Sequence, residues 1–112
     1  METIKAYTTI EQSRKLAEIL PLESADMYID STNPYYIHTE LRHIERFDSE
    51  HHPCWSLAAL LEAMPKIHGL KPILDLEECS IQYSGIDLYI VASNPIDACY
   101  EMILKLQELN LL

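Results

Sequence analysis

The chain has 112 residues, 48% of them hydrophobic, and this length fits a single domain over residues 1–112. Its 18 acidic and 8 basic residues give a formal net charge of -10, and because its Lys and Arg residues form no cluster, direct binding to nucleic acid is not expected. No apolar run approaches the ~20 residues of a membrane span, so no membrane association is expected either.

The cysteines and the first residues indicate the compartment. Three cysteines without a framework spacing predict reduced thiols rather than disulfides. The segment from Met1 to Lys5 has neither the basic region nor the apolar stretch of a secretory signal. We therefore expect a cytoplasmic protein. Its acidity has two interpretations, which are simple solubility and a surface offered to a basic partner.

The first predicted helix follows Thr8 and Thr9, which form overlapping capping boxes with Glu11 and Gln12, and it continues to Leu20. Its apolar residues lie on one side and its charged residues on the other. We therefore expect this helix to pack on the core through one face.

Two short strands are predicted next. Residues 25–30 and 35–41 alternate between apolar and polar side chains, which is typical of half-buried strands. The Ser-Thr-Asn-Pro segment at 31–34 is a turn signal, so the two runs predict a hairpin. Residues 43–52 show no period, and we expect a loop or an irregular turn there.

A second helix is predicted from Pro53 to about Met64. Three strand candidates follow at 73–76, 79–83 and 86–91, with a Ser-Gly turn signal between the last two. Strands joined by short turns favour an antiparallel sheet with helices on one face. The predicted fold is α+β, with three helices and a mainly antiparallel sheet of about four to five strands, in the order α-β-β-α-β-β(-β)-α.

The helix predicted after Asn94 has an unusual cross-section. Asn94 is a suitable N-cap, Pro95 suits the first helical position, and Asp97 places negative charge in the first turn. A face this wide requires cover from more than one side, either a sheet plus another helix or a second copy of the protein. Well over half of the circumference is covered by Ile96, Ala98, Cys99, Tyr100, Met102, Ile103, Leu104, Leu106 and Leu109.

Five residues are candidate contacts with a partner. Tyr100 and Leu104 lie on the broad face of the last helix, where we predict a homodimer interface. Trp55, Tyr28 and Tyr89 are candidates because Trp and Tyr are enriched at protein interfaces. The alternative for each of them is packing in the core or at its rim.

The segment from His51 to Cys54 is the best candidate for chemistry. Imidazole and thiolate bind zinc, so His51, His52 and Cys54 could form a metal site that His38 or His43 completes. A thiol near a helix N-terminus with neighbouring histidines could also act as a nucleophile. No CxxC or HxxxH spacing is present, however, and a polar turn with a partly buried thiol also explains the segment. No catalytic residue and no cofactor are predicted.

Two segments carry a family resemblance. PCWSLAALLEAMP at 53–65 and NPIDACYEMIL at 94–104 flank a Tyr-Ser-Gly hairpin, and residues 23–28 add a third similarity. Together they resemble a family of small bacterial proteins that occur in prophages and other mobile elements. Residues 35–52 fit the family least. The family has no assigned function, so the resemblance implies only an accessory intracellular protein, regulatory rather than metabolic.

Three functional hypotheses follow. The first is a non-enzymatic interaction or regulatory protein of a bacterial mobile element, which forms a homodimer and binds a protein partner. The alternative is an acidic inhibitor that mimics DNA and occupies the basic site of a nucleic-acid-binding protein. The third is a small metal- or thiol-dependent enzyme that uses His51, His52 and Cys54.

Overall fold

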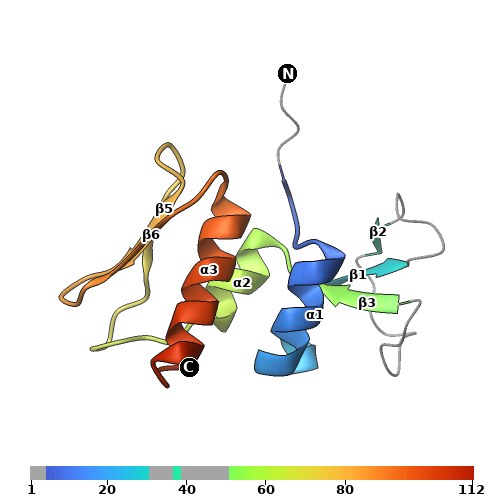
Figure 1. Ribbon diagram of the computed structural model, residues 1–112, viewed down its shortest axis with the longest axis horizontal. Coiled ribbons are helices and arrows are strands. Elements are labelled where there is room, and N and C mark those ends of the chain that lie inside the picture. The colour runs from blue at the N-terminus through green and yellow to red at the C-terminus, as the bar shows by residue number, and fades with distance from the viewer. Residues whose placement is uncertain (1–4, 31–36, 39–50) are drawn as a thin grey trace.

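The computed structural model describes residues 5–30, 37–38 and 51–112. Its strands form two antiparallel three-stranded sheets, in the orders β2-β1-β3 and β4-β5-β6 (Figure 1). The elements in chain order are α1 (Ile10–Ile19), the 3-10 turn η1 (Leu22–Ser24), β1 (Met27–Asp30), β2 (Ile37–His38), β3 (His51–Cys54), α2 (Leu57–Ala63), β4 (Ile73–Asp75), β5 (Ser80–Tyr83), β6 (Leu88–Val91) and α3 (Pro95–Glu108).

The α+β class and the three helices are confirmed, but the arrangement of the strands differs from the prediction. The expected sheet of four to five strands is replaced by two separate sheets of three. The unexpected strand is β3, which falls where the sequence predicted the end of a loop and the start of a helix. It pairs with β1, so that Met27 lies opposite Cys54 and Asp30 lies opposite His51. This tertiary pairing overrides the weak local strand preference of a His-His-Pro-Cys segment.

The second helix consequently begins later than predicted. Pro53 lies in β3 opposite Tyr28, and α2 starts after Ser56, whose hydroxyl accepts a hydrogen bond from the backbone N–H of Ala59 at 3.2 Å. A serine N-cap of this kind satisfies one of the free N–H groups of the first turn. At the other end, the Nζ of Lys71 donates to the carbonyl oxygen of Met64 at 2.5 Å.

The predicted hairpin around 31–34 is present in its coarse form. β1 pairs antiparallel with β2, with Tyr28 opposite His38. The remainder of the predicted strand at 35–41, the turn itself and most of the predicted loop at 43–52 lie outside the described residues.

The three helices lie between the two sheets. In Figure 1, α3 stands between the β4-β5-β6 sheet and α2, while the β2-β1-β3 sheet lies beside α1 at the opposite end. Contacts between α3 and both β5 and β6, between α3 and α2, and between α1 and β3 agree with this view. The chain therefore supplies a sheet on one side of α3 and a helix on another.

This arrangement accounts for the broad apolar face of α3. Ile96, Ala98, Cys99, Met102, Ile103 and Leu106 are all buried within the single chain. Of the two sources of cover that the sequence left open, a sheet plus a helix is therefore the one that the structure supplies. The homodimer predicted from this face is left without its main argument.

None of the helices in residues 5–30 and 51–112 has both the length and the apolar character that crossing a bilayer requires.

Candidate functional site

Of the segment proposed for chemistry, residues 52–54 are buried in β3. His52 is 6% exposed and Cys54 is fully buried. Burial, with a further contribution from the negative charge of Asp26, raises the pKa of the Cys54 thiol to about 12. A thiol in this environment stays protonated at neutral pH, which is the opposite of what an activated nucleophile needs.

A metal site is likewise without structural support. Within residues 5–30, 37–38 and 51–112, no three His, Cys, Asp or Glu side chains gather closely enough to hold a metal ion. His51 lies on β3 opposite Asp30, and its side chain, like those of His38 and His43, lies outside what the structure describes.

Trp55 lies in the core rather than at an interface. Its side chain is 0% exposed, and its indole N–H donates to the hydroxyl of Ser24 at 3.0 Å. Its backbone N–H donates to the hydroxyl of Thr8, also at 3.0 Å. Because its side chain is fully buried, Trp55 has the core packing that was the alternative to a partner contact. Tyr28 is half-buried on β1.

Tyr100 and Leu104 are half-buried on α3. Leu104 and Ile19 line a groove of about 320 Å³ between the two helices. Burial raises the pKa of the Tyr100 hydroxyl, and the nearby carboxylates of Glu11 and Glu101 raise it further. The groove is bordered by residues of both charges, Lys15 and the acids Glu18 and Glu108 among them, and so it selects no one kind of partner.

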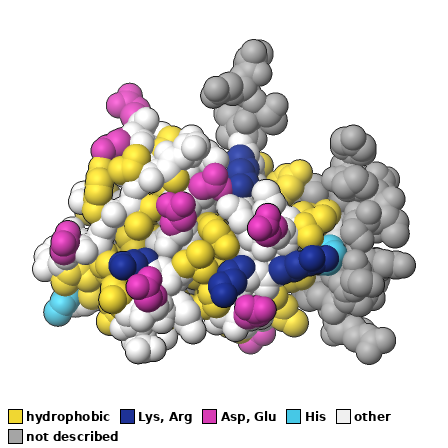
Figure 2. Space-filling model, viewed as in Figure 1, with side chains coloured by type: hydrophobic (Ala, Val, Ile, Leu, Met, Phe, Trp, Pro, Cys, Tyr) yellow, Lys and Arg dark blue, Asp and Glu magenta, His cyan; other side chains and the backbone are white. Residues whose placement is uncertain are grey.

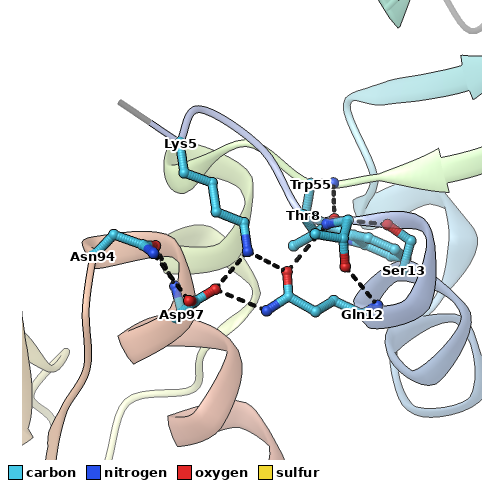
Figure 3. Close-up of polar contacts among 8 residues, drawn as sticks. Lys5, Thr8, Gln12, Ser13, Trp55, Asn94 and Asp97 are labelled. Carbon is cyan, nitrogen blue, oxygen red and sulfur yellow. Dashed lines mark hydrogen bonds and ion pairs between the residues drawn. The ribbon is translucent and has the colours of Figure 1, made fainter. Parts of the chain in front are cut away.

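A polar cluster fixes the start of α3 against the N-terminal segment and α1 (Figure 3). The Asp97 carboxylate accepts hydrogen bonds from Lys5 Nζ at 2.5 Å, Gln12 Nε2 at 2.8 Å and Asn94 Nδ2 at 2.9 Å. Burial alone would raise the pKa of Asp97, but these three donors outweigh it and lower the pKa. The Asp97 carboxylate therefore joins α3 to the N-terminal segment and to α1.

The outward side of the β4-β5-β6 sheet is a surface that the described residues leave uncovered. We call it the outer face and define it by the residues that alternate outward, Ile73, Gln82, Tyr89 and Val91. Ile73 is 53% exposed, Tyr89 48% and Val91 51%. Apolar side chains half exposed to water on one sheet face mark an interaction surface more often than a scattered exposed Leu does.

The opposite side of the same sheet packs on α3. Leu74, Ile81 and Ile90 lie side by side across the three strands, with Ile81 fully buried. Tyr83 also points inward, and its hydroxyl donates to the carbonyl oxygen of Pro65 at 2.7 Å. Burial raises the pKa of Tyr83 to about 12.

Acidic side chains lie beside the outer face. The Glu78 carboxylate accepts hydrogen bonds from the hydroxyls of Tyr89 and Ser80, which holds it against this face. The first of these bonds raises the pKa of Tyr89. Asp75, Glu77 and Asp87 are exposed in β4 and in the two turns of the sheet. Figure 2 shows acidic and hydrophobic side chains at the end of the molecule that this sheet occupies.

Charged residues are also distributed unevenly along the chain. Residues 72–104, which include β4, β5, β6 and most of α3, contain six acidic residues and no Lys or Arg. The N-terminal helix, by contrast, mixes both signs and carries a Lys15–Glu18 ion pair. The outer face is apolar at its centre, and the acids in the sheet and its turns are Asp75, Glu77, Glu78 and Asp87.

A second groove lies between α2 and β4. It has a volume of about 480 Å³ and is lined by Ala58, Leu61, Glu62, Lys71, Pro72 and Leu74. The Nζ of Lys71 is engaged with the last carbonyl groups of α2, at 3.3 Å from Leu61 O, 3.2 Å from Glu62 O and 2.5 Å from Met64 O. The remaining charged residue of the lining is the acid Glu62.

Of the residues predicted from sequence, only Tyr89 belongs to the outer face; Ile73 and Val91 were missed. The signal for Val91 was present, because residues 88–91 are apolar without alternation, which is typical of a strand with two apolar faces. Comparisons with known proteins add nothing to this picture, since no family model, curated protein or solved structure matches the chain.

Proposed function

We propose that this protein is a non-enzymatic interaction module that binds a basic protein partner through the outer face of the β4-β5-β6 sheet. The observation that carries the proposal is the pair of properties of that face. Ile73, Tyr89 and Val91 are half exposed at its centre, and exposed carboxylates lie around it with no cation in residues 72–104.

The two properties have different roles in binding. Removal of the apolar side chains from water would supply affinity at about 25 cal/mol per Å² of apolar surface buried. The surrounding carboxylates would raise the association rate for a positively charged partner and disfavour acidic ones. Such an arrangement, with an apolar centre and a polar rim, is the usual anatomy of a protein interface.

A second copy of this chain is a poor occupant of the outer face. A symmetric dimer presents the same patch from both subunits, so the carboxylates of one copy would face those of the other. Repulsion between carboxylates that face each other across such an interface disfavours association. Most of the broad apolar face of α3, which motivated the homodimer, is already covered within one chain.

A regulatory role in a mobile element remains our prediction from the resemblance of residues 53–65 and 94–104. Within it, an acidic inhibitor of a nucleic-acid-binding protein is a second candidate, favoured by the exposed acids Asp75, Glu77 and Asp87 of the sheet and its turns. The two candidates differ in one respect. For the inhibitor, DNA competes for the partner; for a general interaction module, DNA has no effect on binding.

The experiment is a comparison of three immobilised proteins in the same lysate of the natural host. The first is the unaltered chain, and the second carries Glu77→Lys with Asp87→Lys beside the outer face. The third carries Glu18→Lys with Glu23→Lys, which changes the net charge equally at exposed positions of α1 and η1. Captured proteins are quantified by mass spectrometry at two salt concentrations, with folding of each bait checked by circular dichroism.

We expect one basic protein to be captured by the unaltered chain and by the Glu18/Glu23 variant, with at least tenfold less on the Glu77/Asp87 variant. We also expect weaker capture at high salt, since exposed charges are screened there. Equal capture by all three baits would contradict the proposal. Capture of acidic proteins alone would contradict it as well.

A further inference from the structure

We infer that the partner contributes an extended segment that adds to β4 as a fourth strand and places one apolar side chain in the groove between α2 and β4. The inference rests on the proposed function and specifies how the sheet takes up its ligand. The occupant is a stretch of polypeptide in which Lys or Arg residues flank an apolar residue.

The first argument is the direction of the backbone groups of β4. The N–H of Ala92 donates to the carbonyl oxygen of Cys79 at 3.0 Å, so the backbone of Cys79 faces β6. Successive residues of an antiparallel strand face opposite neighbours, which directs Ser80 and Gln82 toward β4. Their partners there are Asp75 and Ile73.

It follows that Leu74, between those two partners, directs its backbone N–H and C=O away from β5. β4 is the edge of the sheet, and among the described residues no strand pairs with it on that side. An unpaired edge of this kind is the template on which extended peptides are added in β-strand recognition.

The second argument is the groove beside this edge. Leu74 lines it from β4, and Ala58 and Leu61 line it from α2, so it runs along the side where an added strand would lie. The side chain of Leu74 faces the inner side of the sheet, as do those of Ile81 and Ile90. A neighbouring strand would direct alternate side chains to the same side, and therefore into the groove.

The third argument is charge. Lys71 is the cation of the lining, and its ammonium group is bonded to the carbonyl groups that end α2. Glu62 lies in the groove, and Asp75 and Glu77 are exposed at the end of β4. A basic extended segment finds complementary charge at both positions, whereas an acidic segment is repelled.

The edge at β6 is a weaker candidate. The same alternation directs the backbone groups of Tyr89 and Val91 away from β5. The described groove, however, lies beside β4, and it is the groove that gives a strand at this edge a place for a side chain.

The test uses a defined probe, the blocked hexapeptide Lys-Leu-Lys-Leu-Lys-Leu, with Glu-Leu-Glu-Leu-Glu-Leu as the matched acidic peptide. Affinity is measured by titration calorimetry, and backbone amide exchange is followed by NMR with and without the peptide. We expect the basic peptide to bind at least tenfold more tightly than the acidic one. We expect the exchange of the Leu74 amide to slow at least tenfold on binding, with little change at Ile73, whose N–H already faces β5.

Two variants at one exposed helix position separate groove binding from binding elsewhere. Ala58→Leu fills the groove, and we expect it to weaken the peptide at least tenfold, whereas Ala58→Ser keeps the volume and should bind like the unaltered chain. Absence of peptide binding, unchanged exchange at Leu74, or equal affinity for both variants would overturn the inference. The proposed function fails separately, if the Glu77/Asp87 variant captures the partner as well as the unaltered chain does.

Discussion

Helix α3 and the β4-β5-β6 sheet that packs on it both carry more apolar surface than a one-sided element needs, but only on the helix is most of that surface covered within the chain. α3 lies between the sheet and α2, and Met102, Ile103 and Leu106 are fully buried. The sheet has α3 on its inner side, while Ile73 and Val91 on its outer side stay half exposed.

The difference shows what a wide apolar face, recognised in a sequence, does and does not predict. It establishes that an element needs cover on more than one side, but not whether the chain itself supplies that cover. For α3 the chain does supply it, and a second copy is not needed. For the sheet the chain leaves one face open, and that face is where we place the partner.

The largest effect is expected from a matched pair of isoleucines. Ile103→Ala on α3 removes a fully buried side chain and should lower the free energy of unfolding by about 3 kcal/mol. Ile73→Ala on the outer face should lower it by less than about 1 kcal/mol, since that side chain is already half in water. Urea unfolding of both variants measures the difference, and equal losses would show that the sheet face is covered.

A smaller effect is expected at Asp97. Asp97→Asn removes the charge that Lys5, Gln12 and Asn94 bind and should cost about 2 kcal/mol at neutral pH. Glu101→Gln, an exposed position of the same helix, is the matched control and should cost less than about 0.5 kcal/mol.

The pH dependence of the Asp97 effect has a definite sign. The folded state lowers the pKa of Asp97 below that of the unfolded chain. Its contribution is therefore present above about pH 4 and is lost as the pH falls through the folded-state pKa. The difference in stability between the unaltered chain and Asp97→Asn should shrink below pH 4; a difference that grows with acidity would contradict the assignment.

Leu104→Glu should have a still smaller effect. Leu104 is half-buried at the groove between α1 and α3, so we expect a loss of about 1 kcal/mol and a folded protein. Because most of the apolar face of α3 is covered within the chain, sedimentation should give the monomer mass of 12.9 kDa for both the variant and the unaltered chain. A dimer that Leu104→Glu converts to monomer would restore the original homodimer hypothesis.

The three cysteines should differ in their reactivity toward an alkylating reagent. Burial raises the pKa of Cys54 and Cys99 to about 12. Cys79 is partly exposed at the turn before β5. With iodoacetamide at pH 8 we expect alkylation of Cys79 in the native protein and of the other two thiols only in denaturant. Rapid alkylation of Cys54 would revive the thiol-enzyme hypothesis.

Local signals predicted much of the fold. The capping box of Thr9 with Gln12 and the Asn94-Pro95 start are where the sequence placed them, because these contacts join residues a few positions apart. β3 could not be predicted, since its strand conformation comes from pairing with β1 more than twenty residues earlier, and nothing in His-His-Pro-Cys specifies that partner.

The candidate site was less predictable than the fold. The enrichment of Trp and Tyr at protein interfaces made Tyr89 a candidate, but it made Trp55 a candidate equally, and Trp55 is buried. Ile73 and Val91 are functional candidates only because both alternate outward in a sheet that α3 covers from one side, and that is a property of the packing rather than of either residue.

The most direct test of the account is carbene footprinting of the free protein, with modification located by mass spectrometry. We expect strong modification of Ile73, Tyr89 and Val91 on the outer face and almost none of Met102, Ile103 and Leu106 on α3. Protection of the outer face together with modification of the α3 residues would contradict the account, because the uncovered apolar surface would then lie on the helix.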